Sequence, residues 1–276
     1  MTLFEDVVAI VETGSYLMNG QKTPIIFDPT MMSDTKLYSR EFSVKNDITI
    51  NSCHVDVVND DCLKVAYRYI EKYGDVCLLN LASNKNPCGS VIYGEGAQEE
   101  YISLCSDYYR SLFQFTYNEE KYKKYNIPMR ENEHYPLDEC WGGVFSPNVT
   151  FFRERASHAK YRNITPWKCN IIAVPALNCP ECVEKNGQLL ISDTVVPIVK
   201  NKIRTIFRIA LDNSQHNLVL SAWGCGAYKN PPQHIATLFK DILCKEFPHA
   251  FANVIFAING KNNNFEIFHN ILCSNY

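Results

Sequence analysis

The sequence predicts an α/β protein in which hydrophobic strands alternate with amphipathic helices. Two segments carry this prediction, because residues 75–81 and 217–222 are short apolar runs typical of strands buried on both faces. Each run leads into a loop that contains glycine and then into a stretch with helical apolar spacing, which begins after Gln98 and after Pro232. A strand–loop–helix order that occurs twice is typical of a layered α/β sandwich.

The helix after Gln98 continues through Leu112, because residues 101, 104, 105, 108 and 112 keep helical spacing. We expect Glu99, Ser103 and Arg110 on its more exposed side. Helices are also predicted over 3–12 and over 61–73, the second of which ends at Gly74. The remaining predicted elements are strands over 144–145, 149–152, 170–174 and 253–258, and helices over 119–125 and 194–212. Since no linker interrupts this order, we expect one domain over 1–276, with residues 1–60 as an N-terminal accessory region.

The composition excludes several classes of protein. A formal net charge of −3 gives no basic stripe for sequence-specific nucleic-acid binding. No apolar stretch approaches the roughly 18 residues that a membrane helix needs, and the start lacks the basic region of a signal peptide. The chain has 12 cysteines, which in this context indicate reduced, mostly buried thiols. We therefore expect an intracellular protein, cytoplasmic or nuclear, without membrane contact.

One pair of cysteines has the spacing of a metal site. Cys179 and Cys182 form a CxxC motif, but a zinc site normally requires a second pair or well-spaced histidines. A zinc module is thus an alternative that elemental analysis would test, and structural cysteine is the favoured interpretation.

The loops that follow the two apolar strands are the candidate functional segments. In open α/β sheets, ligands bind at the carboxyl ends of strands. Gly224-Cys225-Gly226 is a candidate phosphate cradle, since glycines allow backbone N–H groups to approach an anion, although glycines also simply shape turns. Glu99 and Glu100 open a helix, where acids either complement the helix dipole or reach a bound ligand.

Two motifs carry a resemblance to a known family. Cys88-Gly89-Ser90 is followed after seven residues by Gln98-Glu99-Glu100, and residues 222–230 read Ala-Trp-Gly-Cys-Gly-Ala-Tyr-Lys-Asn. This arrangement resembles the microbial-type poly(ADP-ribose) glycohydrolases of the macrodomain superfamily. The resemblance covers most of the chain. It implies a three-layer α/β/α macrodomain-like sandwich with a mixed central sheet and an N-terminal helical extension.

The resemblance also implies an activity and the residues that carry it. The expected reaction is hydrolysis of the ribose–ribose O-glycosidic bonds of ADP-ribose polymers on modified proteins, by a monomer that uses no metal or cofactor. Glu100 would be the catalytic acid, Glu99 would hold ribose hydroxyls, and Gln98 would contact the nucleotide. The other expected ADP-ribose contacts are Ser83, Asn84, Cys88, Gly89 and Ser90 in the first loop and Gly224, Cys225, Gly226, Ala227 and Tyr228 in the second.

Helix geometry agrees with a single catalytic carboxyl. Neighbouring helical residues point about 100° apart, so Glu99 and Glu100 cannot flank a glycosidic bond from opposite faces as two-carboxylate glycosidases require. One residue would therefore act first as acid and then as base.

Three departures from the family pattern keep alternatives open. Cys88 and Ser90 replace family glycines, and Ser83 stands where the family has asparagine. The alternatives are a non-catalytic ADP-ribose reader and a hydrolase of another linkage, such as an ester or mono-ADP-ribose. A nucleophilic Cys88 would need a histidine partner, for which His134 and His158 are the candidates.

Overall fold

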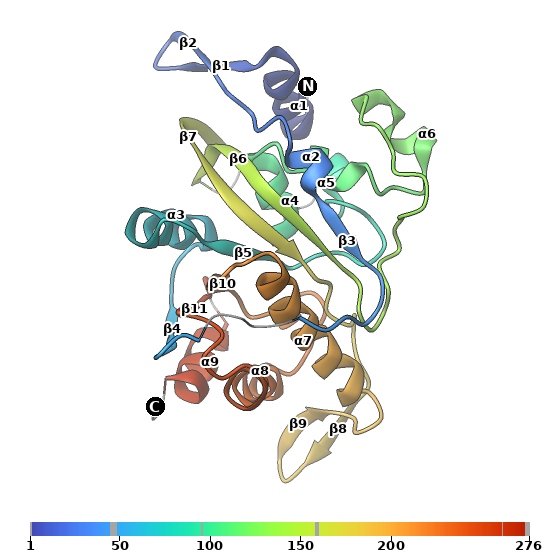
Figure 1. The fold of residues 1–276 in the computed structure, drawn as a ribbon, viewed down its shortest axis with the longest axis vertical. Helices are drawn as coiled ribbons and strands as arrows, with labels where there is room; N and C mark the ends of the chain where they lie inside the picture. Colours follow the sequence, from blue (N-terminus) through green and yellow to red (C-terminus); the bar gives the residue numbers. More distant parts are fainter. Residues whose placement is uncertain (1, 45–48, 95, 158–159, 261, 274–276) are drawn as a thin grey trace.

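A seven-stranded mixed sheet forms the centre of the molecule, in the order β3-β6-β7-β5-β10-β11-β4 (Figure 1). The computed structural model describes residues 2–44, 49–94, 96–157, 160–260 and 262–273. Strands β7, β5, β10, β11 and β4 run parallel to one another, whereas β6 is antiparallel to both of its neighbours. The strands are β3 (Lys36–Tyr38), β4 (His54–Val58), β5 (Cys77–Asn80), β6 (Gly143–Ser157), β7 (Lys160–Ala173), β10 (Asn217–Leu220) and β11 (Asn253–Ala257).

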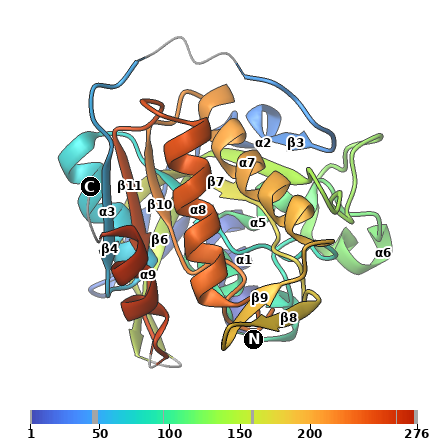
Figure 2. The ribbon, with the colours of Figure 1, turned by 90° about the horizontal axis from the view of Figure 1, so that it is seen from below.

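Helices cover both faces of this sheet. One face carries α1 (Leu3–Thr13), α3 (Cys62–Tyr73), α4 (Gln98–Cys105) and α5 (Tyr109–Phe113), and the other carries α7 (Val196–Asp212), α8 (Pro232–Glu246) and α9 (Asn264–Leu272). Figure 2 shows α7, α8 and α9 in front of the sheet. In β10, Val219 faces the first layer and Leu218 and Leu220 face the second, as strand geometry requires. The predicted α/β/α sandwich with a mixed sheet is confirmed.

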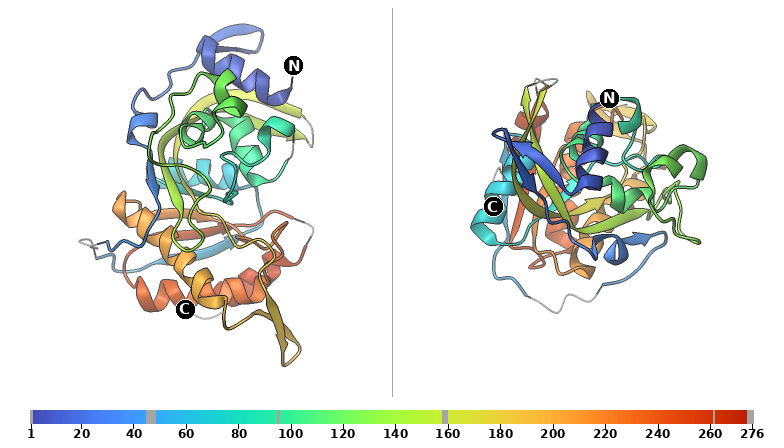
Figure 3. Two further views of the ribbon diagram at one scale, coloured as in Figure 1. Left: turned by 90° about the vertical axis from the view of Figure 1, so that its right-hand side faces the viewer. Right: turned by 90° about the horizontal axis from the view of Figure 1, so that it is seen from above.

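Smaller elements extend the two ends of the molecule. The hairpin β1 (Ser15–Met18)–β2 (Gln21–Pro24) and the hairpin β8 (Cys182–Lys185)–β9 (Gln188–Ile191) lie at opposite ends (Figure 3). The short helices are α2 (Met31–Asp34), α6 (Glu119–Tyr122) and the 3₁₀ turns η1 (Val91–Tyr93) and η2 (Lys123–Tyr125). Residues 1–60 contribute both edge strands of the central sheet, β3 and β4, in addition to α1.

The bounds of α3 follow directly from capping residues. The Asp61 carboxylate accepts hydrogen bonds from the N–H groups of Leu63 and Lys64, and Gly74 ends the helix with φ at 85°. An aspartate at the N-cap and a glycine after the last turn are the preferred residues at these positions.

The prediction of one continuous helix over 98–112 was wrong. α4 ends at Cys105, and Ser106 takes extended backbone that forms a β-bridge with Phe151 before α5 begins. Glu99 and Ser103 are also buried rather than exposed, with Ser103 donating its hydroxyl to the Glu99 carbonyl oxygen. The helix lies between the sheet and α1, so its polar side chains face the protein interior and a cleft instead of bulk solvent.

Strands β6 and β7 are longer than the apolar pattern indicated. Only their inner halves carry the predicted apolar runs, but pairing continues through Arg153↔Asn163 and Arg155↔Tyr161 toward the hairpin end. The polar outer halves form a two-stranded ribbon against α1, α3 and the β1–β2 hairpin.

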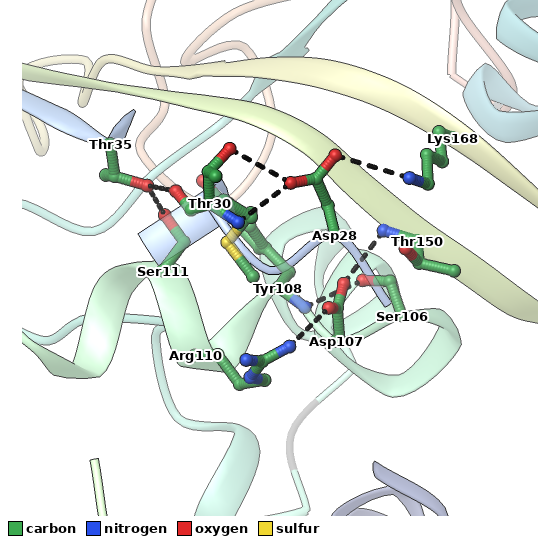
Figure 4. A network of polar contacts seen from close by, with 11 residues as sticks. Asp28, Thr30, Thr35, Ser106, Asp107, Tyr108, Arg110, Ser111, Thr150 and Lys168 are labelled. Atoms are coloured by element: carbon green, nitrogen blue, oxygen red, sulfur yellow. Dashed lines mark hydrogen bonds and ion pairs between the residues drawn. The ribbon is translucent and has the colours of Figure 1, made fainter. Parts of the chain in front are cut away.

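A buried polar network fixes the segment between α4 and α5 to the inner part of β6 (Figure 4). Asp107 is fully buried, accepts a hydrogen bond of 2.8 Å from the Thr150 N–H, and pairs with Arg110 at 3.2 Å. Burial raises the pKa of Asp107 to about 6, against the effect of these two partners. The network thus satisfies the polar groups exposed by the break between α4 and α5.

Among the residues that the structure describes, none of the helices combines the length and apolar character needed to cross a bilayer.

Candidate active site

A cleft lies where β5 and β10 end, between the loop after β5 and the loop after β10. Its volume is about 360 Å³. The two strands are parallel neighbours in the sheet, so their carboxyl ends meet at the same edge, where α/β proteins bind ligands. The predicted site residues that line this cleft are Ser83, Gly89, Ser90, Gln98, Glu99, Glu100, Gly224, Gly226, Ala227 and Tyr228. Asn84, Cys88 and Cys225 are not among its lining residues.

Gln98 holds the end of β5 against the start of α4. Its Oε1 accepts a hydrogen bond of 2.7 Å from the Leu81 N–H, and its Nε2 donates one of 2.8 Å to the Leu79 carbonyl. The ladder between β5 and β10 covers only Cys77 and Leu78. The Gln98 amide therefore takes the place of the neighbouring strand where the two strands separate, and it fixes the floor of the cleft.

Glu99 is held at both carboxylate oxygens. Oε1 accepts from the Asn80 side chain at 3.1 Å, and Oε2 accepts from the Ser83 N–H at 2.6 Å. Only 3% of the residue is exposed, and this burial raises the pKa of Glu99 to about 8, helped by the charge of Glu100 and opposed by the two hydrogen bonds.

Glu100 has one anchored oxygen and one open oxygen. Oε1 accepts a hydrogen bond of 2.8 Å from the Ser90 N–H. Oε2 is buried and has no hydrogen-bond partner among the described residues, although the side chain lines the cleft. A carboxyl oxygen without a partner in a cleft is the group available for proton exchange with a ligand.

The backbone of Gly89 packs closely against the carboxyl groups of Glu99 and Glu100. A Cβ at this position would overlap Oε1 of Glu100 and would lie 3.1 Å from Oε2 of Glu99. Its φ of 59° is also in the left-handed region that glycine adopts most easily. Any side chain here would displace Glu100.

Asn80 completes the support behind Glu99, and the sequence analysis did not identify it. Its amide nitrogen donates to Glu99 and to the Tyr108 hydroxyl, each at 3.1 Å, while Asn80 and Tyr108 are fully buried. The available signal was a polar residue at the end of an otherwise apolar strand, because a buried amide needs polar partners.

Cys88 faces the protein core and not the cleft. The residue is fully buried with φ at 58°, so it retains the left-handed conformation at a family glycine position. Burial raises the pKa of its thiol well above the ordinary value, with Glu99 adding to the effect. His134 is exposed and contacts the Glu131 carbonyl, and His158 lies outside the described residues. A buried thiol with a raised pKa is a poor nucleophile.

Asn230 holds the second loop in shape. Its amide nitrogen lies within hydrogen-bond distance of three carbonyl oxygens, those of Leu177, Gly224 and Tyr228, at 2.8, 3.1 and 3.1 Å. Trp223, fully buried, donates its indole N–H to the Val174 carbonyl at 2.8 Å. These contacts attach the loop to the segment that follows β7.

The second loop presents backbone N–H groups to the cleft. The amides of Cys225 and Asn230 close internal turns, whereas those of Gly226, Ala227 and Tyr228 have no protein acceptor within the described chain. A Cβ built on Gly226 would meet nothing within 4 Å, so this part of the loop borders open space. Several adjacent amides without acceptors form a concave anion site.

Tyr228 reaches across the cleft to the first loop. The Ser83 side chain and the charges of Glu99 and Glu100 lie near enough to its phenolic oxygen to act on its pKa. Burial, with these charges, raises the pKa of Tyr228. Tyr228 of the second loop and Ser83 of the first loop therefore lie near each other at the cleft.

A second cavity of about 280 Å³ continues the cleft toward β11 and β4. It shares Leu81, Ala97, Gln98 and Gly226 with the cleft and will be called the outer cavity. Its charged and amide-bearing lining residues other than Gln98, none of them predicted as site residues from the sequence, are Asp61, Arg155, Asn259, Asn262 and Asn264. Arg155 lies 4.2 Å from the ring of Tyr101, and its Nε is buried without a hydrogen-bond partner among the described residues.

Cys179 and Cys182 lie at the start of the β8–β9 hairpin, and the Cys179 N–H donates to the carbonyl oxygen of Tyr228, a lining residue of the cleft, at 2.9 Å. Cys182 contacts the Pro180 carbonyl oxygen at 3.2 Å, and Cys179 is exposed. Within the described ranges, no group of three or more histidine, cysteine, aspartate or glutamate side chains is arranged to hold a metal ion.

Comparisons with known proteins identify solved structures of the same fold. The chain is similar to a Thermomonospora curvata poly(ADP-ribose) glycohydrolase bound to the inhibitor ADP-HPD, with 24% identity, a TM-score of 0.74 and 96% of each chain covered. It is also similar to a Deinococcus radiodurans poly(ADP-ribose) glycohydrolase in complex with ADP-ribose, with 25% identity and a TM-score of 0.63, over 90% of this chain and 99% of that one.

No curated protein sequence matches the chain. The family model described as "Microbial-type PARG, catalytic domain" matches residues 5–154, more than half of the chain, including the first loop and both glutamates. The protein therefore belongs to the microbial-type poly(ADP-ribose) glycohydrolase (PARG) catalytic-domain family.

Proposed function

We propose that the protein is a poly(ADP-ribose) glycohydrolase that cleaves ribose–ribose O-glycosidic bonds and releases ADP-ribose. Family membership and the ADP-ribose complex of the Deinococcus radiodurans relative support the ligand. The single observation that carries the catalytic part is the difference between the two glutamates. Both oxygens of Glu99 have donors, whereas Oε2 of Glu100 is buried in the cleft without one.

In this proposal one sugar nucleotide occupies both the cleft and the outer cavity. The diphosphate would lie on the amides of Gly226, Ala227 and Tyr228, which have no protein acceptor in the described chain. The distal ribose would then lie beside Glu99 and Glu100, and the adenosine half would occupy the outer cavity. The asparagine, aspartate and arginine side chains there supply the donors and acceptors that a nucleoside requires.

In this proposal Glu100 acts twice. Its carboxyl proton moves to the departing ribose oxygen while the bond from that oxygen to the anomeric carbon breaks. The resulting carboxylate takes a proton from the water that attacks the anomeric carbon, which restores the acid and leaves one hydroxyl on each product. The diphosphate stabilises the positive charge that develops on the sugar.

Glu99 and Gln98 position the reacting groups. Glu99 is fixed by Asn80 and Ser83, so its carboxyl group has one orientation toward the ribose hydroxyls. Gln98 sets the distance between β5 and α4, and this distance determines where Glu100 lies relative to the sugar. Such positioning contributes to the rate because small displacements of a reacting group are costly.

The test uses substrates of defined linkage. Purified protein is first titrated with free ADP-ribose by calorimetry and then incubated with ADP-ribose polymer, an ADP-ribosyl ester and a mono-ADP-ribosylated protein. We expect binding of ADP-ribose and release of ADP-ribose from the polymer. Binding without release from any substrate would instead identify a reader, and release from the ester or the monomeric modification alone would identify a different hydrolase.

A further inference from the structure

A groove outside the active site has the size and chemistry of a second nucleotide subsite. It lies between α3, the β1–β2 hairpin and the outer halves of β6 and β7 (Figure 1), and its volume is about 660 Å³. We call it the α3 groove. The residues used below are Lys64, Tyr67, Arg68, Arg153, Arg162 and Trp167.

The α3 groove is basic although the whole chain is acidic. Four cations line it, Lys64, Arg68, Arg153 and Arg162, against the single carboxylate of Glu154. The formal net charge of the chain is −3, so its overall composition does not account for this cluster. A local basic cluster with hollow shape favours a phosphate-bearing ligand.

Three of the four cations are ion-paired, and the buried Arg153 pairs with Asp6, so Lys64 and the two exposed arginines are the ones a ligand can reach. Arg68 pairs with Asp60 at 2.9 Å and Arg162 pairs with Glu154, but their side chains are 53% and 69% exposed. Lys64 has no ion pair with any described residue. Exposed ion pairs contribute little stability, and a phosphate accepts charge-assisted hydrogen bonds from guanidinium groups more strongly.

An aromatic pair stands beside the cations. The half-buried indole of Trp167 stacks on buried Phe151 at 4.4 Å between ring centroids, and the ring of Tyr67 meets it edge-on at 5.5 Å. Tyr67 keeps 42% of its surface exposed. Aromatic faces next to basic side chains are the combination that binds bases and phosphates together.

The groove adjoins the proposed substrate path. Tyr101 lines both the α3 groove and the outer cavity, which in turn shares four residues with the cleft. Tyr101 also donates its hydroxyl to Asp61 at 3.2 Å, so it forms a fixed wall between the two spaces.

We propose that the α3 groove binds the neighbouring ADP-ribose unit of a polymer whose adjacent unit occupies the cleft. This inference rests on the proposed function, because it assigns the adenosine half of the first unit to the outer cavity. The adenine of the second unit stacks on the exposed ring of Tyr67, beside Trp167, and its diphosphate contacts Lys64, Arg68 and Arg162. The two units are joined through the adenosine end of the unit in the cleft, so the groove selects chains over single ADP-ribose molecules.

The experiment compares ligand length in a protein that does not consume the ligand. In the Glu100→Gln background, fluorescence anisotropy measures the affinity for ADP-ribose, for defined ADP-ribose oligomers and for an oligoadenylate RNA of equal charge. The groove is altered by Lys64→Ala with Arg162→Ala, and separately by Tyr67→Ala. Lys72→Ala is the matched control, since Lys72 lies on the same helix but does not line the groove.

We expect oligomers to bind about tenfold more tightly than ADP-ribose, the gain that one stacked base provides. The groove variants lose this gain and keep the affinity for ADP-ribose, whereas Lys72→Ala changes neither. The proposed subsite is overturned if monomer and oligomer bind with equal affinity, or if the groove variants keep the gain. It is also overturned if the RNA binds as tightly as the ADP-ribose oligomers. If oligomers bind through the groove but ADP-ribose alone does not bind, the proposed function fails and the groove stands. Absence of binding by both contradicts both proposals.

Discussion

The backbone of Gly89 lies against the carboxyl group of Glu100, so closely that a methyl group on Gly89 would occupy the place of Oε1. The next residue, Ser90, donates its N–H to that same oxygen at 2.8 Å. The first loop therefore both anchors Glu100 and leaves no space for a side chain at residue 89. This contact connects the glycine of the sequence motif to the position of the proposed catalytic acid.

The first prediction concerns Gly89→Ala. The added methyl group displaces Glu100, and we expect polymer hydrolysis to fall by about 100-fold or more, as a shift of a reacting group by about 1 Å does. Gly14→Ala is the control, because Gly14 has nearly the same φ, 60°, but a Cβ there meets nothing within 4 Å. Both variants carry similar backbone strain, so equal activity losses would contradict the contact with Glu100 as the cause.

The second prediction concerns the pH dependence of stability. Because the pKa of Glu99 is raised to about 8 in the folded protein from an ordinary value of 4.5, the folded state holds this proton more tightly than the unfolded state does. Stability therefore falls as pH rises from 4.5 to 8. Between pH 6 and pH 9 the ionisation of Glu99 lowers the free energy of unfolding by roughly 3 kcal/mol.

Urea unfolding of wild type and Glu99→Gln at pH 6 and pH 9 measures this effect. Glutamine cannot ionise, so the variant should lose less stability than wild type over this interval. An identical loss in both proteins would show that Glu99 ionises with an ordinary pKa.

The third prediction concerns the second loop. Asn230→Ala removes the donor from three carbonyl oxygens, and we expect the free energy of unfolding to fall by about 1–3 kcal/mol and the affinity for ADP-ribose to fall about tenfold. Asn213→Ala, which removes a donor to the Ile209 carbonyl at the end of α7, should lower stability alone. Unchanged ADP-ribose affinity in Asn230→Ala would show that ligand binding does not depend on the loop shape that Asn230 holds.

The fourth prediction concerns Cys88. Since the thiol is fully buried with a raised pKa, we expect no labelling of Cys88 by iodoacetamide at pH 8 in the folded protein, while exposed Cys179 reacts. Cys88→Ala should retain most of the hydrolytic activity. Loss of activity in a Cys88→Ala protein with native stability would return this thiol to the list of candidate nucleophiles.

Local signals predicted the parts of the fold that local interactions determine. Asp61 and Gly74 stand at the two ends of α3, and the apolar runs of β5 and β10 are buried on both faces. The pairing of β6 and β7 beyond their apolar halves depends on the partner strand and on the helices beside it. No periodicity within residues 153–168 carries that information.

In the candidate site, too, features set by local sequence were predicted and features set by tertiary neighbours were not. The motifs correctly selected the two loops that form the cleft, but the burial of Glu99 was missed because polar helical residues usually face solvent. Asn80, Asn230 and Arg155 come from elements far apart in the chain, and their roles depend on tertiary neighbours. Tyr228 was identified by position, whereas its proximity to Ser83 at the cleft follows only from the folded structure.

The measurement that tests the central claim most directly is polymer hydrolysis by Glu100→Gln beside Glu99→Gln, with ADP-ribose affinity measured for both. Glutamine keeps the shape of each side chain and can still accept from the Ser90 or Ser83 N–H. If Glu100 transfers the proton, Glu100→Gln lowers the hydrolysis rate by at least about 100-fold, within the range that general acid–base catalysis supplies, and ADP-ribose affinity stays near that of wild type. Hydrolysis at the wild-type rate by a folded Glu100→Gln protein that still binds ADP-ribose would show that another group carries the chemistry.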